Sequence, residues 1–298
     1  MDFTFTRLVC TLRLESDGTD LDPFLRLKGL YPELFRMEAG CRGPACPGCR
    51  DGSCAWHRAF ARELSSDPSA VKRFQKPSLP FVFELPPVPR SPNRGSELPV
   101  GLLLAGTAVN SLPLFLAAFR RAVSMLAGSG FAATLVSVAT LDAAGRPVPL
   151  VLDDPAAPQG IILLTPDDLL AGRTLSADRV TVTFATPLRI VRDGRPLREI
   201  AFSDLVRGLL RRVSSLAYYY ADAELSLDYR WLSERSAEVV TVSAAFRWTE
   251  RSGGWSGVTG RAEYGGELGE FLPLLLLGEL FHLGKGAGWG QGRLLTSL

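Results

Sequence analysis

Proton transfer near neutral pH is the chemistry for which this sequence offers the fewest candidates. The 298 residues include only two histidines, His57 and His282, and imidazole is the side chain whose ordinary pKa lies closest to neutrality. His282 directly follows an apolar segment, FLPLLLLGELF, and precedes a run of glycines. At that place it either exchanges protons with a ligand or caps the last carbonyl groups of a helix.

The run of glycines is a second feature with chemical potential. Exposed backbone N–H groups in such a run can form an anion-binding nest, because no side chain keeps an anion at a distance. The glycines follow a predicted helix and do not match the G-x-G-x-x-G spacing, so a dinucleotide-binding fold is excluded. The alternative is a turn before a terminal strand. The predicted phosphate-binding loop spans 284–292 and consists of Gly284, Gly286, Gly288, Gly290 and Gly292, with Lys285 and Arg293 adding positive charge.

Cysteine spacing points to a metal site. Four of the five cysteines lie in CRGPACPGCRDGSC, a C-x4-C-x2-C-x4-C pattern. Four thiolates in so short a loop can close a tetrahedral zinc site, and we predict one structural zinc. An iron–sulfur cluster and four free thiols are the alternatives. The predicted ligands are Cys41, Cys46, Cys49 and Cys54, whereas Cys10 lies in a predicted strand and reads as a buried thiol.

The elements that must position these residues follow one order twice. Strand and helix periodicities predict strand, helix, strand, strand, helix, strand in each half, which is the ferredoxin-like or RRM-like order of an α+β fold. In the first half the elements fall at 3–14, 21–37, 79–85, 98–106, 110–126 and 131–141. In the second half they fall at 180–186, 203–220 with Ser203 as its cap, 237–248, 256–264, 270–282 and 292–297.

This repetition predicts tandem ferredoxin-like domains. The first domain covers 1–145 and carries the cysteine-rich insertion at 41–54, and the second covers 179–298. A hairpin and linker at 146–178, rich in Pro, Asp and Ala, separates them.

Bulk charge predicts no particular partner, because 33 lysines and arginines oppose 31 aspartates and glutamates. Binding to an anionic polymer would therefore depend on local clusters. One cluster follows a predicted strand and turn and continues along the next helix: Arg189, Arg192, Arg195, Arg198, Arg207, Arg211 and Arg212.

The first residues, MDFTFTRLVCTLRLE, alternate like a strand and lack the features of a secretory signal. The longest apolar stretch is far shorter than the roughly 20 residues that span a bilayer. We therefore expect a cytoplasmic protein with no membrane partner.

Several segments resemble those of CRISPR repeat-processing endoribonucleases, members of the RAMP superfamily. The end of the chain, GEFLPLLLLGELFHLGKGAGWGQGRL, resembles their glycine-rich C-terminus. VTFATPLRI, RRVSSLAYYY, RSGGWSGVTGRAEY, LPFVFELPP and GLLLAGTAVNSLPLFLAAFRRA agree with the family in order, so the resemblance covers nearly the whole chain.

The resemblance implies metal-independent RNA cleavage, in which a ribose 2′-OH attacks the adjacent phosphate and leaves a 2′,3′-cyclic phosphate. Such a reaction needs a base, an acid and cations around the phosphorane, and no catalytic cofactor. We assign proton transfer to His282. RNA contacts are expected from the glycine loop with Lys285 and Arg293, and from Arg207, Arg211, Arg212 and Arg36.

The first helix departs from the family pattern. Many relatives carry a histidine in a run like L-R-G-x-F-G-H-x-L-R, whereas this chain has KGLYPELFR with Glu33 in its place. Tyr31 and Lys28, together with Arg36, are the remaining candidates there for a weaker cationic site. His57 is a further candidate if the chain beyond the cysteines folds back toward the first helix.

Two other functions remain open from the sequence. A non-catalytic RAMP subunit that binds guide RNA in a CRISPR effector complex would use the same fold and glycine loop. A zinc-stabilised assembly scaffold would use the cysteines and leave the glycine loop without a role. The expected partners are CRISPR repeat RNA, effector-complex subunits and a second copy of the chain as a homodimer.

Overall fold

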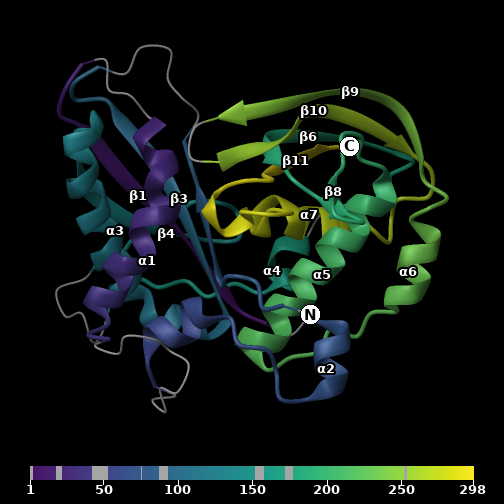
Figure 1. Cartoon of the computed structure of the whole chain (residues 1–298), viewed down its shortest axis with the longest axis horizontal. Coiled ribbons are helices and arrows are strands. Elements are labelled where there is room, and N and C mark those ends of the chain that lie inside the picture. Colours follow the sequence, from purple (N-terminus) through teal and green to yellow (C-terminus); the bar gives the residue numbers. More distant parts are fainter. Residues whose placement is uncertain are drawn as a thin grey trace.

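The chain forms two lobes, each consisting of an antiparallel sheet covered by helices (Figure 1). A computed structural model describes residues 3–17, 22–41, 53–74, 76–86, 93–151, 158–171, 177–251 and 254–298. In the described ranges, no helix is long and apolar enough to cross a membrane.

The first lobe has the strand order β2-β3-β1-β4-β5. It contains β1 (Phe5–Leu14), α1 (Leu27–Glu38), β2 (Phe81–Glu84), β3 (Glu97–Ala105), α3 (Leu112–Leu126), β4 (Ala133–Leu141) and β5 (Pro147–Pro149). Apart from β5, this is the ferredoxin-like arrangement, in which the first and third strands lie in the centre of the sheet.

The second lobe repeats the arrangement with the strand order β11-β6-β10-β9. It contains β6 (Arg179–Leu188), α5 (Phe202–Ala221), β9 (Val240–Arg251), β10 (Trp255–Gly265), α7 (Leu272–Phe281) and β11 (Leu294–Ser297). The predicted tandem ferredoxin-like fold is therefore confirmed.

Burial explains two patterns in the sequence, the alternation of apolar residues in β1 and the nearly continuous apolar run of α7. Alternate residues of β1, including Leu8, Cys10 and Leu12, are buried in one core with Phe35 and Phe115 of the two covering helices, as a half-buried strand requires. The α7 helix is apolar on nearly all sides because it lies between its sheet and α5. A Cβ at Gly278 would come within 2.7 Å of Leu209 on α5, so glycine permits this close packing and thereby fixes the position of α5.

Several elements differ from the predictions. The N-cap of α5 is Ala201, not Ser203, and the Asp204 carboxylate accepts a hydrogen bond from the Ala201 N–H at 3.2 Å. The sequence analysis did not predict the short helices α2 (Pro68–Arg73) and α6 (Tyr229–Arg235), or the hairpin of β7 (Val191–Arg192) and β8 (Arg195–Pro196). Short elements have too few residues to show a periodicity.

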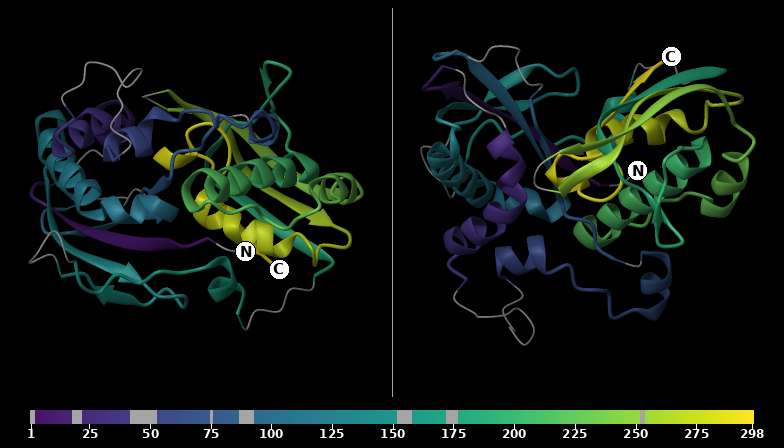
Figure 2. Two further views of the ribbon diagram at one scale, coloured as in Figure 1. Left: turned by 90° about the horizontal axis from the view of Figure 1, so that it is seen from below. Right: turned by 45° about the horizontal axis from the view of Figure 1, so that its top comes forward.

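The segment expected to be a linker takes part in the fold. It contains β5 and α4 (Pro166–Leu170), and Leu164 pairs with Phe5 of β1. Phe5 in turn packs its ring edge-to-face on Phe281 of α7, with centroids 5.5 Å apart. The two lobes therefore share an interface, the seam, where Phe5 of β1 packs on Phe281 of α7. In Figures 1 and 2 the yellow C-terminal part of the chain lies between the lobes.

Candidate nucleic-acid interface

The glycine-rich loop enters the seam between the domains instead of lining an open surface. Trp289 is only 7% exposed and contacts the rings of Phe81 and Phe83 on β2, at 5.1 and 6.1 Å between centroids. A Cβ at Gly290 would lie 2.8 Å from the Phe83 carbonyl oxygen. The glycines of this part of the loop are therefore needed for the approach to β2.

Most N–H groups of the loop are bound within the protein. Those of Trp289, Gly290 and Gly292 donate to the carbonyl groups of Gly286, Ala287 and Pro187, at 2.9 to 3.1 Å. An anion nest over the whole of 284–292 is therefore not formed, because the seam uses Gly288 and Gly290 for packing. Gly284, Lys285 and Gly286 lie nearer the surface: Lys285 is exposed, and the two glycines are half-buried.

His282 lies inside the protein. Its side chain is 0% exposed, and its ring nitrogens, although near backbone groups of Gln291 and Ala287, make no hydrogen bond of good geometry with a described residue. Burial, reinforced by Arg293 and Arg212, lowers the pKa of His282 to about 3. In this position the neutral, enclosed ring of His282 cannot contact RNA. The access to a ligand that its proposed role in proton transfer requires is therefore not found. His282 is the C-cap residue of α7, and its backbone N–H donates to the Gly278 carbonyl oxygen at 3.0 Å. Its ring bonds to no carbonyl group of a described residue, so the alternative of capping by the side chain is not seen either.

The three candidate residues of the first helix lie in different surroundings. Tyr31 is fully buried, and its hydroxyl donates to the Phe115 carbonyl oxygen at 2.7 Å. Burial raises the pKa of Tyr31 well above its ordinary value. The phenol is therefore a core group, contrary to its assignment as a site residue. Lys28 is exposed on α1, and half-buried Arg36 lies 3.8 Å from the Glu33 carboxylate.

His57, in contrast, reaches the surface at the seam. The segment that follows the cysteines folds back on α1, as the alternative prediction required: the Trp56 indole N–H donates to the Pro32 carbonyl oxygen at 3.1 Å. Phe60 packs on Phe35 with ring centroids 5.2 Å apart. The His57 side chain is 21% exposed, and its Nε2 lies 3.3 Å from a carboxylate oxygen of Glu63.

His57 borders a hollow of about 170 Å³ between the two domains. Arg58, Arg62 and Tyr219 also line it. Arg62 adopts a left-handed backbone conformation at φ 55°, and its Nε donates to the Pro77 carbonyl oxygen at 2.6 Å. The hollow thus brings an accessible imidazole together with two guanidinium groups.

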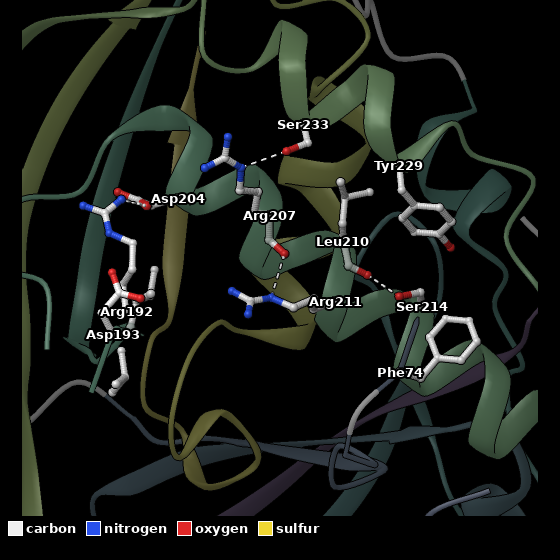
Figure 3. A pocket seen from close by; sticks show the side chains of 12 residues that line it. Phe74, Arg192, Asp193, Asp204, Arg207, Leu210, Arg211, Ser214, Tyr229 and Ser233 are labelled. Atoms are coloured by element: carbon white, nitrogen blue, oxygen red, sulfur yellow. Dashed lines mark hydrogen bonds and ion pairs between the residues drawn. The ribbon is translucent and has the colours of Figure 1, made fainter. Parts of the chain in front are cut away.

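A basic groove of two adjoining hollows follows the outer side of α5. The larger hollow has a volume of about 640 Å³ and the smaller about 340 Å³. Figure 3 shows the larger one, with Arg207 and Arg211 extending from α5. Arg207 donates to the Ser233 hydroxyl at 2.8 Å, whereas Arg212 turns inward and donates to the Phe281 carbonyl oxygen at 3.1 Å.

The structure separates the arginines that the sequence analysis grouped together. Arg189, Arg192, Arg207, Arg211 and Arg212 line the groove, and Lys285 joins them from the glycine loop. Exposed Arg195 and Arg198 do not line either hollow, and Arg198 lies over the Trp248 ring at 3.6 Å. Half-buried Arg293 faces Glu84 across the seam at 3.5 Å.

Two aromatic residues of the groove escaped the sequence analysis. Phe74 follows α2 and Tyr229 begins α6. Both lie in segments without a clear periodicity of apolar residues. No local pattern therefore indicates that their side chains line the same hollow beside α5.

Most of the predicted zinc loop lies outside the described residues. Cys46 and Cys49 lie outside the described residues, while Cys41 and Cys54 on either side are half-buried free thiols. Within the described ranges, no group of three or more His, Cys, Asp or Glu side chains is arranged to hold a metal. The zinc site stays a prediction.

The structure thus combines a tandem ferredoxin-like fold with a basic groove beside the domain seam. Residues 182–294 match the family of the CRISPR-associated endoribonuclease Cas6, and residues 3–159 match a family described as an N-terminal domain. By the first of these matches, the second domain belongs to the family of CRISPR-associated Cas6 endoribonucleases. No curated protein sequence matches it.

Solved structures agree in fold at low sequence identity. A chain of a partial Cas6-RT-Cas1–Cas2 complex has a TM-score of 0.61 and 12% identity, over 99% of this chain and 46% of that one. A Cas6 product complex has a TM-score of 0.59 and 16% identity, over 98% of this chain and 100% of that one. Thermus thermophilus Cas6 has a TM-score of 0.56 and 15% identity over the whole of both chains. This chain therefore spans less than half of the Cas6-RT-Cas1 chain and the full length of the Thermus protein.

Proposed function

We propose that this chain cleaves CRISPR repeat RNA without a metal ion and leaves a 2′,3′-cyclic phosphate and a 5′-hydroxyl. The observation that carries the proposal is the seam hollow, where His57 lies with Arg58 and Arg62. The match of the second domain to the Cas6 family supports the substrate class.

In the proposed reaction, a base removes the proton of a ribose 2′-OH, which attacks the adjacent phosphorus. The bond from phosphorus to the 5′-oxygen then breaks, and an acid protonates the leaving oxygen. His57 is suited to proton transfer, because it is the one of the two histidines with access to solvent. In this proposal, Arg58 and Arg62, which line the same hollow, stabilise negative charge on the phosphorane.

The basic groove on α5 supplies the RNA-holding surface in this proposal. Its exposed Arg207 and Arg211 face outward, and Lys76 and Lys285 border the smaller hollow. Such side chains bind phosphates without reading sequence and fix the register of the RNA. Effector-complex subunits and a second copy of the chain are further proposed partners.

The test is single-turnover cleavage of the source organism's CRISPR repeat RNA in excess EDTA, with analysis of the product ends. Cleavage to cyclic-phosphate and 5′-hydroxyl ends supports the proposal. Binding without cleavage would assign the chain to the guide-RNA-binding subunits. Neither binding nor cleavage would favour an assembly scaffold.

A further inference from the structure

We propose that the two adjoining hollows on α5 form a seat for one unpaired nucleotide of RNA, with its base in the larger hollow and its phosphate in the smaller one. The inference rests on the proposed function in one respect, namely that the ligand is repeat RNA. It adds a defined binding site for a single nucleotide outside the seam hollow of His57.

The smaller hollow has the charge of a phosphate site. Five cationic side chains line it, and no carboxylate is among its described lining residues: Lys76, Arg189, Arg211, Arg212 and Lys285. Gly284 adds backbone without a side chain, and Ser78 and Ser215 add hydroxyl groups. Clustered cations repel one another, so such a group is favourable only when an anion binds between them.

Arg212 is the strongest single indication of that anion. Its side chain is 9% exposed, and burial lowers its pKa to about 10. Its Nη2 has no hydrogen-bond partner among the described residues, although Nε donates to Phe281. A buried guanidinium with an unused donor is costly in free energy. Both this Nη2 and the unpartnered Nε of Arg189 are covered by protein atoms, so a phosphate oxygen in the hollow would bond to them only after the side chains turn toward it.

The larger hollow is suited to a flat, partly apolar group. Phe74, Tyr229, Ile190 and Leu210 contribute apolar surface, and its volume lies in the range of small-ligand sites. In Figure 3 the rings of Phe74 and Tyr229 lie at one end of the hollow, while Arg192 and Asp204 lie at the other. Stacking on an aromatic ring combined with polar contacts at the edge is how proteins hold single-stranded bases.

The two hollows adjoin, because four residues line both: Phe74, Ile190, Val191 and Arg211. A base in one and its own phosphate in the other would therefore be neighbours, with Arg211 between them. A paired base is covered by its neighbours in the duplex and cannot enter, so the occupant is an unpaired nucleotide.

The wall of the seat is formed before RNA binds. The Phe74 ring stacks on Tyr218 of α5 with centroids 4.6 Å apart, and the Ser78 N–H donates to the Ser215 hydroxyl at 3.0 Å. Phe74 and Ser78 of the first domain thus lie against α5. The seat exists only while the two domains are docked.

The first experiment measures the affinity for repeat RNA carrying a 2′-deoxyribose at the mapped cleavage position, or for unmodified RNA if no cleavage occurs. An abasic nucleotide is placed at each unpaired position in turn. We expect one position at which base removal weakens binding by about tenfold, as for the loss of one stacked base. Equal affinity at every position would overturn the proposal.

Variants then connect that position to the seat. Tyr229→Leu should weaken binding of intact RNA by about tenfold and remove the sensitivity to the abasic position. Trp231→Leu is the matched control, because Trp231 is 49% exposed on the same helix and does not line the hollow. Full sensitivity in Tyr229→Leu would overturn the assignment.

The salt dependence of RNA affinity tests whether a phosphate binds in the smaller hollow. Arg211→Gln should lower affinity and reduce the slope of log affinity against log salt by about one. Arg230→Gln, which removes an exposed arginine paired with Glu234 at 2.9 Å, should leave the slope unchanged. Equal salt slopes for Arg211→Gln and Arg230→Gln would contradict the assignment of a phosphate to the smaller hollow.

Competition with AMP, GMP, CMP, UMP and inorganic phosphate distinguishes RNA from a free nucleotide. We expect weaker binding of each than of the same nucleotide within RNA. A mononucleotide that binds more tightly would overturn the RNA assignment. Abasic sensitivity without cleavage contradicts the nuclease proposal alone, whereas cleavage without abasic sensitivity contradicts the seat alone.

Discussion

The indole ring of Trp289 lies edge-on to the phenyl ring of Phe81 with centroids 5.1 Å apart, although the two residues belong to different domains. Trp289 comes from the glycine-rich loop and is buried in the core of the first domain. The loop therefore joins the two domains. Its glycines serve this contact, since side chains at Gly288 and Gly290 would meet backbone atoms of β2.

We expect Trp289→Ala to lower the free energy of unfolding by about 3–5 kcal/mol, because a large aromatic side chain leaves a buried site. The measurement is equilibrium unfolding in guanidinium chloride. Trp231→Ala is the control and should change stability by less than about 0.5 kcal/mol, since Trp231 is 49% exposed. Equal losses in both variants would contradict the role of Trp289 in the seam.

Gly292 should tolerate substitution far less well than another glycine of similar conformation. Its φ is +65°, and an added Cβ would lie 1.7 Å from the Leu283 carbonyl oxygen. Gly95 has φ +83° and nothing within 4 Å of an added Cβ. We expect Gly292→Ala to destabilise the protein by more than about 4 kcal/mol, as in severe backbone disruption, and Gly95→Ala by about 1 kcal/mol.

Thermal unfolding of the two glycine variants measures this difference. Similar melting temperatures would show that the loop can move away from Leu283 without loss.

Stability should fall as the pH is lowered, owing to His282. Burial lowers its pKa to about 3 from an ordinary 6.5, so the unfolded chain binds a proton that the folded protein excludes. The stability present above pH 6.5 is therefore lost progressively between 6.5 and 3, by up to about 1.4 kcal/mol per pH unit.

The non-titrating variant His282→Leu tests this dependence. Urea unfolding at pH 7.5 and pH 5 should show a smaller loss of stability in the variant than in the original protein. An identical loss would mean that other groups account for it.

The order of the elements could be predicted because it depends on local patterns. The alternation in β1 and the helical spacing in α3 are both read from neighbouring residues, and both elements lie where they were expected. In α1 the helical spacing of Tyr31, Leu34 and Phe35 places them on the buried face. Tyr31 therefore lies in the core, although the resemblance to the family implied a role for it in the site.

The placement of the two histidines could not be predicted from the sequence. His282 leaves α7 with φ 55°, and its ring is enclosed near Arg293 and Arg212. His57 reaches the surface only because Trp56 and Phe60 anchor its segment on α1. Both outcomes depend on contacts between residues far apart in the chain, which no local pattern contains.

The cysteine insertion should hold about one equivalent of zinc in protein purified without chelator. Replacing Cys46 and Cys49 with Ser should lower stability more than it lowers cleavage per folded molecule, because the insertion is proposed to be structural. Metal analysis by mass spectrometry is the measurement. Less than about half an equivalent of any metal would contradict the site.

Cleavage should depend on His57 and not on His282. Loss of a general acid or base lowers a rate by about 10²–10⁴, so His57→Ala should slow single-turnover cleavage by that order while RNA affinity changes little. His282→Leu should cleave at the original rate per folded molecule, because its ring is enclosed and neutral at pH 7. The opposite result, a slow His282→Leu and an active His57→Ala, would mean that RNA binding opens the seam and exposes His282 to the substrate.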